Sequence, residues 1–211
     1  MDVSRQPPDV AVVERGPRAR TRRLMVETAT RLMQDGAVPS VTDVAEAAQV
    51  SRATAYRYFP SQAALVHAVV DEALGPILEW KSPGGDAEAG VADLFETALP
   101  RIDAFEATFR AALKHALEQW AQRRAGTLGN EPPFKRGHRI DLLRAAIAPL
   151  GDTLPEAGLD RLAKALSLLF GIETLVIMKD IWDADAEEAR ALVQWMARIL
   201  VRGAAADAAK S

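Results

Sequence analysis

The stretch Ser40–Phe59, SVTDVAEAAQVSRATAYRYF, carries the clearest structural pattern in this chain. Ser40 is a favourable N-cap, and Asp43 three residues later completes the pattern of a capping box, so a helix is predicted to begin here. Ser51 is a second N-cap, which predicts another helix over residues 52–58. The stretch therefore predicts two short helices separated by a tight turn.

The spacing of small residues indicates how these two helices pack. Ala45 and Ala48 fall on one face of the first helix and allow the second helix to approach closely, while Gln49 and Val50 form the turn. This is the pattern of a helix-turn-helix, whose second helix enters the major groove of DNA. The second helix leaves several side chains exposed that can contact phosphates and base edges: Arg52, Ala53, Thr54, Tyr56, Arg57 and Tyr58.

A longer pattern contains these helices: Val44-Ala45-x-x-Ala48-x-Val50-Ser51-x-x-Thr54-x-Tyr56-x-Tyr58-Phe59-x-Ser61, followed by Leu65. It resembles the signature of the TetR family of transcriptional regulators. With the preceding helix, the resemblance covers about a quarter of the chain. It implies an all-α protein of about nine helices, in which a three-helix helix-turn-helix DNA-binding domain precedes a helical ligand-binding and dimerisation domain.

The sequence departs from the usual family pattern at three positions. Gln49 stands where the family often has glycine, and a left-handed conformation there would cost about 1 kcal/mol. Ala55 replaces a common leucine, which thins the local core. Gln62 replaces a common lysine, so a neutral amide would have to donate to the phosphate.

The resemblance also implies a function: a ligand-responsive bacterial regulator, most simply a repressor, that binds a palindromic DNA operator as a homodimer and leaves it when an unknown small-molecule effector binds. Base edges would be contacted by Thr42, Arg52, Ala53 and Thr54. Phosphates would be held by Ser40, Tyr56, Tyr58 and Gln62, with Ser51 at the start of the reading helix.

Charge is distributed unevenly along the 211 residues. The formal net charge is -3, yet six arginines between residues 15 and 31 face only Glu27, so a basic field is expected there: Arg15, Arg18, Arg20, Arg22, Arg23 and Arg31. Cysteine is absent, and we find no signal-peptide core and no apolar run long enough to span a membrane. A cytoplasmic protein without membrane attachment is expected.

Hydrophobic periodicity and turn residues divide the chain into three parts. Residues 1–16 are expected to be a flexible arm, 17–76 the DNA-binding domain, and 77–211 the C-terminal domain. In the C-terminal part the breaks, including Pro100, predict helices over residues 87–98, 101–124, 136–149, 156–181 and 185–202.

Aromatic residues of the C-terminal part are candidates for lining a ligand pocket, although an aromatic stripe is more often plain core. Glu173 falls on the apolar face of its helix, where it either pairs with an arginine or lies at the edge of a pocket. The candidates are Trp80, Phe95, Phe105, Phe109, Trp120 and Glu173.

The last two long helices carry more apolar surface than one small body can cover, which predicts a homodimer interface of four helices, two from each copy. The interface candidates are Leu162, Leu166, Leu169, Phe170, Leu192, Met196, Ile199 and Leu200.

Catalytic and metal-binding signatures are missing from the sequence. His67, His115 and His138 are scattered without metal-ligand spacing, and His115 is expected at the surface. No nucleophile elbow, P-loop or dinucleotide fingerprint occurs, so neither an enzyme nor a cofactor is predicted. Two alternatives stay open: a helical small-molecule-binding protein or enzyme that retains the helix-turn-helix as scaffold, and a regulator that binds a protein partner through its apolar helix faces.

Overall fold

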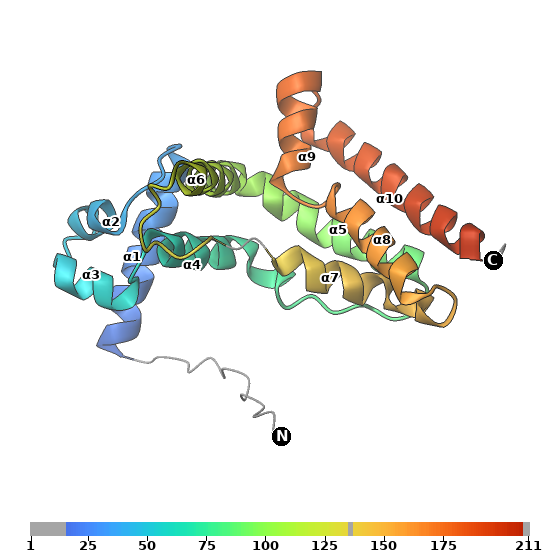
Figure 1. Cartoon of the computed structure of the whole chain (residues 1–211), viewed down its shortest axis with the longest axis horizontal. Coiled ribbons are helices and arrows are strands. Elements are labelled where there is room, and N and C mark those ends of the chain that lie inside the picture. The colour runs from blue at the N-terminus through green and yellow to red at the C-terminus, as the bar shows by residue number, and fades with distance from the viewer. Residues whose placement is uncertain (1–15, 135–136, 209–211) are drawn as a thin grey trace.

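The computed structural model describes residues 16–134 and 137–208, and these contain α-helices and turns but no β-strand. The N-terminal helices lie at one end of an elongated molecule and the remaining helices form its body (Figure 1). Most of the predicted arm, residues 1–15, lies outside the described residues. The all-α fold expected from the sequence is confirmed.

The N-terminal helices are α1 (Pro17–Gln34), α2 (Val41–Ala47), α3 (Arg52–Tyr58) and α4 (Gln62–Leu74). The capping box is confirmed: the Asp43 amide donates to Ser40 Oγ at 3.1 Å, and the Ser40 amide donates to Asp43 Oδ2 at 2.8 Å. The hydrogen bond from the Ser40 amide lowers the pKa of the Asp43 carboxyl group, and the Ser40 side chain lowers it further. Ser51 caps α3 in the same way, through a 3.2 Å bond from the Thr54 amide.

The body contains α5 (Ala87–Ala104), α6 (Glu106–Ala125), α7 (His138–Ile147), α8 (Glu156–Ser167), α9 (Ile172–Val176) and α10 (Ala186–Ala208). Shorter turns join them: 3₁₀ turns at Gly75–Ile77 and Ala148–Asp152, and a π-helical turn at Ile177–Ile181 that continues α9. Among the described residues, no helix is long and apolar enough to cross a membrane.

Two predicted helix boundaries are wrong. Pro100 lies inside α5, and the chain breaks instead at Phe105, which caps α5 and precedes α6. The predicted helix over residues 156–181 is interrupted at Gly171, whose φ of 141° is outside the helical region. The described residues therefore form ten α-helices where about nine were expected.

Buried apolar residues form two clusters. The first fills the space between α1, α2, α3 and α4, and it also includes Ala111 and Ala112 from α6. The second fills the body and includes Ala73 and Leu74 at the end of α4. Helices α4 and α6 therefore belong to both ends of the molecule, and their packing ties the N-terminal helices to the body.

Side chains of the body also hold both ends of α4. Glu131, in the loop before α7, accepts a 2.9 Å hydrogen bond from the Ala63 amide in the first turn of α4. At the other end, the Arg101 guanidinium donates to the carbonyl oxygens of Ala73 (2.5 Å) and Glu72 (3.0 Å). Both charges complement the helix dipole and satisfy end groups that the helix itself leaves unpaired.

Candidate DNA-reading surface and ligand cavity

Helix α3 presents a polar face to solvent. Arg52, Ala53, Tyr56 and Arg57 are exposed, whereas Ala55 points inward and is fully buried against the N-terminal cluster. The small Ala55 side chain brings the axis of α3 close to this cluster without exposing apolar surface. Helix α3 lies at the outer edge of the molecule (Figure 1), and Arg52 and Ala53 in its first turn are exposed.

Hydrogen bonds orient the polar groups of this face. The Ser51 hydroxyl donates to Thr54 Oγ1 at 2.9 Å, which leaves the Thr54 hydroxyl hydrogen available to an acceptor outside the chain. The Thr42 hydroxyl on α2 and the Tyr56 hydroxyl on α3 lie 3.4 Å apart. Predicted contact residues from α2 and α3 therefore meet on one surface.

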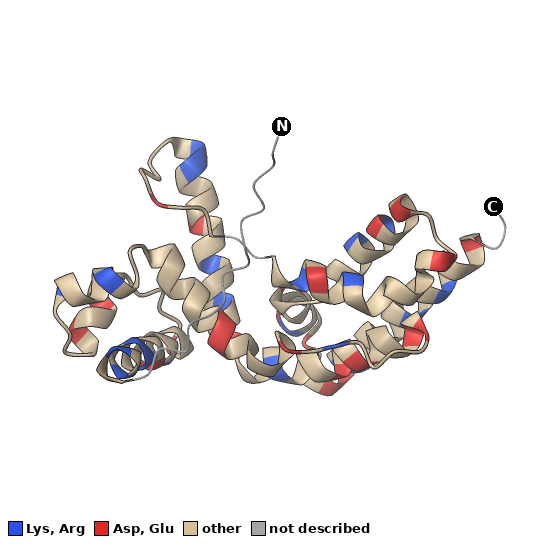
Figure 2. Cartoon of the chain, turned by 90° about the horizontal axis from the view of Figure 1, so that it is seen from below, with Lys and Arg blue, Asp and Glu red and all other residues tan. Residues whose placement is uncertain are grey.

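Basic side chains extend this surface onto α1. Arg18, Arg20, Arg22 and Arg23 are all exposed, and Figure 2, which views α1 nearly end-on, shows blue basic segments on it. The Arg22 guanidinium lies 5.6 Å from the ring centre of Phe59, directly after α3, so the basic end of α1 is close to the reading helix. Positive charge here would attract the phosphate backbone of DNA.

Gln62 does not have the orientation expected of a phosphate contact. Its amide nitrogen donates to the carbonyl oxygens of Val38 (3.3 Å) and Pro39 (3.1 Å), so both of its N–H donors point into the protein. Without the long, charged side chain of a lysine, the amide satisfies the nearer backbone acceptors. In this structure Gln62 stabilises the chain between α1 and α2.

A small cavity of about 70 Å³ lies in the body, close to α4. Its wall is mostly apolar, with two basic side chains, His138 and Arg139, from the start of α7. The residues that line it are Val70, Leu74, Ile102, Phe109, Ala112, Phe134, His138, Arg139, Leu142, Phe170, Gly171 and Ile172. This volume suits a few water molecules, so a drug-sized ligand would have to push the helices apart.

Only Phe109 among the predicted pocket residues lines this cavity. Phe95 is fully buried and meets Phe170 edge-on, with ring centres 5.3 Å apart, so it belongs to the core. Trp80 donates its indole N–H to Asp93 Oδ2 at 2.7 Å. Trp120, at 63% exposure, lies on the outer face of α6.

Phe105, also predicted to line the pocket, lies on a different surface. Together with Arg101 it lines an open cleft between the body and α1, and the Arg101 guanidinium lies 4.8 Å from its ring centre. The predicted stripe through Phe105 and Trp120 assumed one uninterrupted helix from residue 101. The break at Phe105 rotates the residues before it relative to α6.

Glu173 pairs with an arginine, which was the first of the two expectations for this residue. Arg139 Nη2 lies 3.1 Å from Glu173 Oε2, and Arg139 Nη1 donates to the Ser167 carbonyl oxygen at 3.2 Å. Glycine at position 171 leaves room for this contact, because a Cβ atom there would lie 2.8 Å from both Arg139 Nη2 and Glu173 Oε2. Glu173 is not a lining residue of the cavity, but its partner Arg139 is.

His115 is buried, contrary to the surface position expected for it. It is only 3% exposed, its ring centre is 5.5 Å from that of Phe134, and its Nε2 atom has no hydrogen-bond partner among the described residues. Burial lowers the pKa of the imidazole, an effect that the nearby Glu118 and Glu131 partly oppose. His115 is therefore a neutral core residue.

The predicted dimer residues divide into two groups. Leu162, Leu166, Leu169 and Phe170 are buried within their own chain, so they are not available to a second copy. The break at Gly171 and the packing of α8 against α7 and α10 place them in the body core. Leu192 and Ile199 are exposed, whereas Met196 and Leu200 are partly buried against the core.

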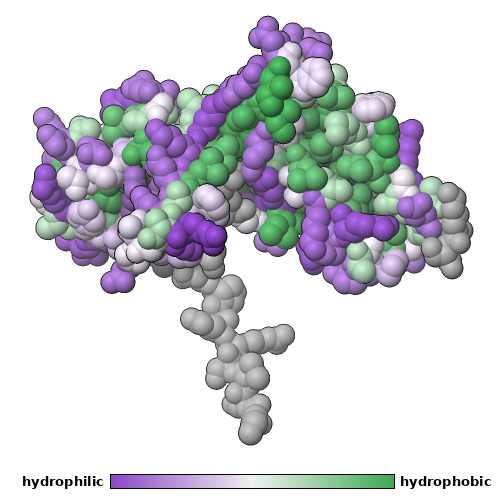
Figure 3. Space-filling view, turned by 45° about the horizontal axis from the view of Figure 1, so that its top comes forward, coloured by the Kyte–Doolittle hydropathy of each residue, from purple (hydrophilic) through white to green (hydrophobic). Residues whose placement is uncertain are grey.

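The exposed apolar residues are concentrated around the end of α8, α9 with its π-helical turn, and α10 (Figure 3). A network of ion pairs holds the projecting π-helical turn against α6: Lys179 Nζ lies 2.6 Å from Glu106 Oε2, and Arg110 Nη2 lies 2.6 Å from Asp180 Oδ1. The hydrogen bonds that Lys179 donates to Asp103 and to Glu106 raise the pKa of its ammonium group. The apolar set comprises Leu168, Ile177, Ile181, Trp182, Leu192, Trp195 and Ile199.

Comparisons with known proteins agree with the geometry of the N-terminal helices. The family model of bacterial regulatory proteins of the tetR family matches residues 25–69. A curated protein, the HTH-type transcriptional repressor LfrR of Mycolicibacterium smegmatis, is 29% identical over 106 residues, which cover 50% of this chain and 47% of that protein. The match thus spans about half the length of that relative.

Two solved structures share the fold. A TetR transcriptional regulator from Rhodococcus sp. RHA1 has a TM-score of 0.57 and 18% identity, and the match covers 88% of this chain and 97% of that one. The TetR family regulator PfmR from Thermus thermophilus has a TM-score of 0.52 and 17% identity, covering 90% and 97%. Residues 25–69, which span most of α1–α4, therefore match the helix-turn-helix model of the tetR family of bacterial regulatory proteins, and the chain shares its fold with two TetR regulators.

Proposed function

We propose that this protein is a ligand-responsive transcriptional repressor that binds a palindromic DNA operator as a homodimer. The observation that carries the proposal is the exposed face of α3, capped by Ser51 and placed beside the basic end of α1. A capped helix with arginine, threonine and tyrosine on its open face suits the major groove, and nearby arginines suit phosphates. The relative named as a repressor favours repression over activation.

Base-reading and phosphate-holding residues have separate roles in this proposal. Arg52, Ala53 and Thr54 read base edges because they form the first turn of α3. Thr42 of α2 joins them because its hydroxyl lies beside that of Tyr56 on the same surface. Phosphates are held by Ser40, Tyr56 and Tyr58, together with the exposed arginines of α1. Gln62 is left out of this set because its amide donates inward.

The domain division places the reading module in residues 17–76 and the ligand-binding and dimerisation part in residues 77–211. Ligand response is supported by the position of the cavity. Val70 and Leu74 of α4 contribute to its wall, and Ala112 of α6 contributes to both the cavity wall and the N-terminal cluster. A ligand that enlarges the cavity therefore pushes on α4 and α6, and it moves α3 relative to the body.

Movement of α3 lowers operator affinity when two copies must read major grooves about 34 Å apart. Ligand and DNA then oppose each other through one coupling free energy, so operator binding also weakens binding of the ligand. Because the cavity is small and mostly apolar, the effector is expected to be a compact apolar molecule with a group that accepts hydrogen bonds from Arg139 or His138.

Dimerisation is supported by the two apolar faces of α10. Ala189, Val193 and Ala197 recur every four residues and are buried in the chain's own core. Trp195 and Ile199 lie on another face and are 54% and 48% exposed. A second copy that covers this exposed face with its own α10 buries Trp195 and Ile199 of both chains. The two-fold symmetry of such a dimer matches a palindromic operator.

The proposal is tested by selecting bound duplexes from a random DNA pool with the purified protein. A two-fold symmetric consensus, with half-sites about one helical turn apart or a multiple of that spacing, is expected. A screen of small molecules for release of the selected duplex then identifies the effector. Enrichment of no sequence over the starting pool would contradict the proposed function.

A further inference from the structure

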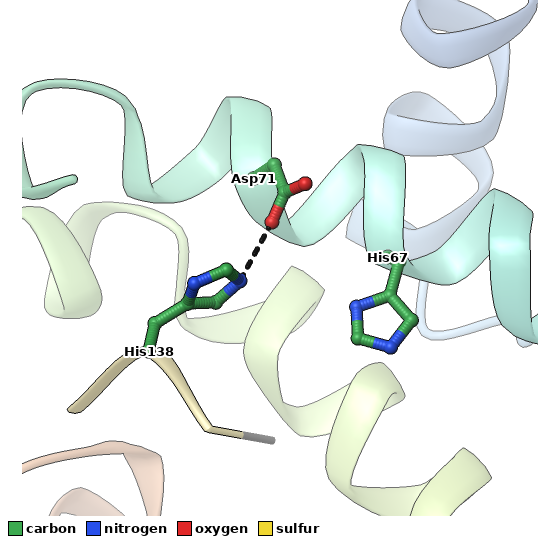
Figure 4. A group of neighbouring side chains, drawn as sticks. All are labelled: His67, Asp71 and His138. Atoms are coloured by element: carbon green, nitrogen blue, oxygen red, sulfur yellow. Dashed lines mark ion pairs between the residues drawn. The ribbon is translucent and has the colours of Figure 1, made fainter. Parts of the chain in front are cut away.

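Two histidines and an aspartate meet where α4 faces the beginning of α7. His67 and Asp71 are one turn apart on α4, and His138 is the first residue of α7, so the loop before α7 brings the third side chain to the other two (Figure 4). One ligand atom from each residue lies within 4.8 Å of the other two. Nε2 of His138 is 2.8 Å from Oδ1 of Asp71.

The surrounding residues hold this group in position. The His67 ring packs against Phe134, with ring centres 4.6 Å apart. Phe134 is fixed in turn by Gln119, whose Oε1 accepts from the Phe134 amide at 2.8 Å and whose Nε2 donates to the Pro132 carbonyl oxygen at 3.1 Å. Burial lowers the pKa of the His67 imidazole.

An exposed ion pair between Asp71 and His138 explains only part of this arrangement. The two side chains are 48% and 41% exposed, and pairs of this kind contribute little to stability. The ion pair does not include the second imidazole, that of His67, which packs against Phe134 beside it. A metal ion accounts for all three side chains, because two imidazoles and one carboxylate are a common ligand set for divalent transition metals.

We propose that His67, Asp71 and His138 form a binding site for a divalent transition-metal ion of the Zn²⁺ type. Two nitrogen ligands disfavour Mg²⁺ and Ca²⁺, which prefer sites made of oxygen atoms. Ligand atoms at zinc distances of about 2.0–2.1 Å lie roughly 3.3 Å apart, which falls between the 2.8 Å that separates His138 Nε2 from Asp71 Oδ1 and the 4.8 Å that bounds the group, so small rotations of the side chains suffice. Asp71 and His138 are exposed enough to rotate in this way.

The metal site lies between α4 and the cavity, and the proposed function does not require it. Asp71 and His67 belong to α4, which packs against α1 and α6, while His138 also lines the cavity. A bound ion would join α4 to α7 beside the cavity and leave at least one coordination position open to water or to another ligand.

The test uses the full-length protein without an affinity tag. Zn²⁺ binding is measured by titration calorimetry, and Co²⁺ binding by its visible d–d absorption. We expect one ion per chain, with Asp71→Asn and His138→Asn each weakening binding by more than the roughly 10- to 100-fold typical of residues that only orient a ligand. Glu72→Gln is the matched control: it removes the same charge from the neighbouring position of α4 and should bind like the wild type.

Either of two results would overturn the site. One is no saturable Zn²⁺ or Co²⁺ binding by the wild-type protein. The other is equal binding by Asp71→Asn, His138→Asn and Glu72→Gln, which would place the ion elsewhere. Circular dichroism confirms that the variants fold, and both Asn variants lie at exposed positions where folding is expected to persist. DNA binding is not needed for any of these measurements, so failure of the metal site is distinguishable from failure of the proposed function.

Discussion

Gln49 adopts a backbone conformation that suits glycine better. Its φ is 55°, and the turn that follows α2 depends on it, since the Val50 amide donates to the Ala45 carbonyl oxygen at 2.8 Å. Removing the side chain relieves the left-handed strain, so Gln49→Gly should raise the free energy of unfolding by about 1 kcal/mol. Urea denaturation measures the change.

Ala47→Gly provides the control for that prediction. It places the same residue within α2, where glycine has no strain to relieve, and should lower stability by about 1 kcal/mol. If both substitutions destabilise the protein alike, strain at Gln49 is not the cause.

Arg52 and Tyr56 should affect DNA binding in different ways. Arg52→Ala removes a candidate base contact, so it should weaken binding by about 1–3 kcal/mol and relax the preference at one base pair. Tyr56→Phe removes one hydroxyl proposed to contact phosphate and should weaken binding to every sequence by about 1 kcal/mol. Affinities for single-base variants of the selected operator separate the two patterns, and uniform loss for Arg52→Ala would disprove its role as a reader.

At the residue scale, local chemistry made some features predictable. The caps at Ser40 and Ser51 depend on neighbours three residues away, so the sequence revealed them. The inward hydrogen bonds of Gln62 and the burial of His115 depend on segments more than ten residues distant. Such contacts are set by tertiary packing and gave no local signal.

Helix α4 is the element that joins the proposed reading surface to the cavity, and Arg101 holds its C-terminal end. Arg101→Met leaves two carbonyl groups without their donor, which should cost about 1–3 kcal/mol of stability. Arg144→Met is the control, since Arg144 makes only exposed ion pairs with Glu156 and Asp160 and should change stability by roughly 0–1 kcal/mol. Equal losses in thermal unfolding would exclude a special role for Arg101.

At the element scale, helix existence was easier to predict than helix continuity. Pro100 reads as a break in sequence, yet it lies within α5, and Gly171 interrupts an apolar pattern that reads as one helix. These two errors shifted the expected helix faces. The first error accounts for the misplacement of Phe105, and the second, with the packing of α8 against α7 and α10, for the burial of Leu162 and Leu166, which had been assigned to an interface.

At the scale of the whole molecule, the exposed face of α10 predicts self-association. Trp195→Asp places a charge in the proposed interface and should weaken the dimer by about 2 kcal/mol, or roughly 30-fold in dissociation constant. Trp120→Asp, at a similarly exposed tryptophan of α6, is the matched control and should leave the dimer intact. Sedimentation equilibrium checks both, and a wild-type monomer at micromolar concentration would contradict the interface.

The association of distant segments was the least predictable feature. His67 and His138 are separated by more than sixty residues, so spacing in the sequence could not reveal that they meet. The cavity likewise combines residues of α4, α5, α6, α7 and α9 with residues of the segments before α7 and before α9. None of these residues is unusual within its own part of the sequence. The helix-turn-helix, by contrast, is continuous in sequence, which is why its residues and its family were recognisable.

The most direct test of the account is the affinity of the purified protein for DNA, measured by fluorescence anisotropy over a series of salt concentrations. The first duplex tested is the DNA upstream of the protein's own coding region, followed by the operator selected from the random pool. Each is compared with a scrambled duplex of equal length. The account predicts binding to the operator at least about 10³-fold tighter than to the scrambled duplex, with log affinity falling steeply against log salt. Equal affinity for both duplexes, with a shallow salt dependence, would contradict it.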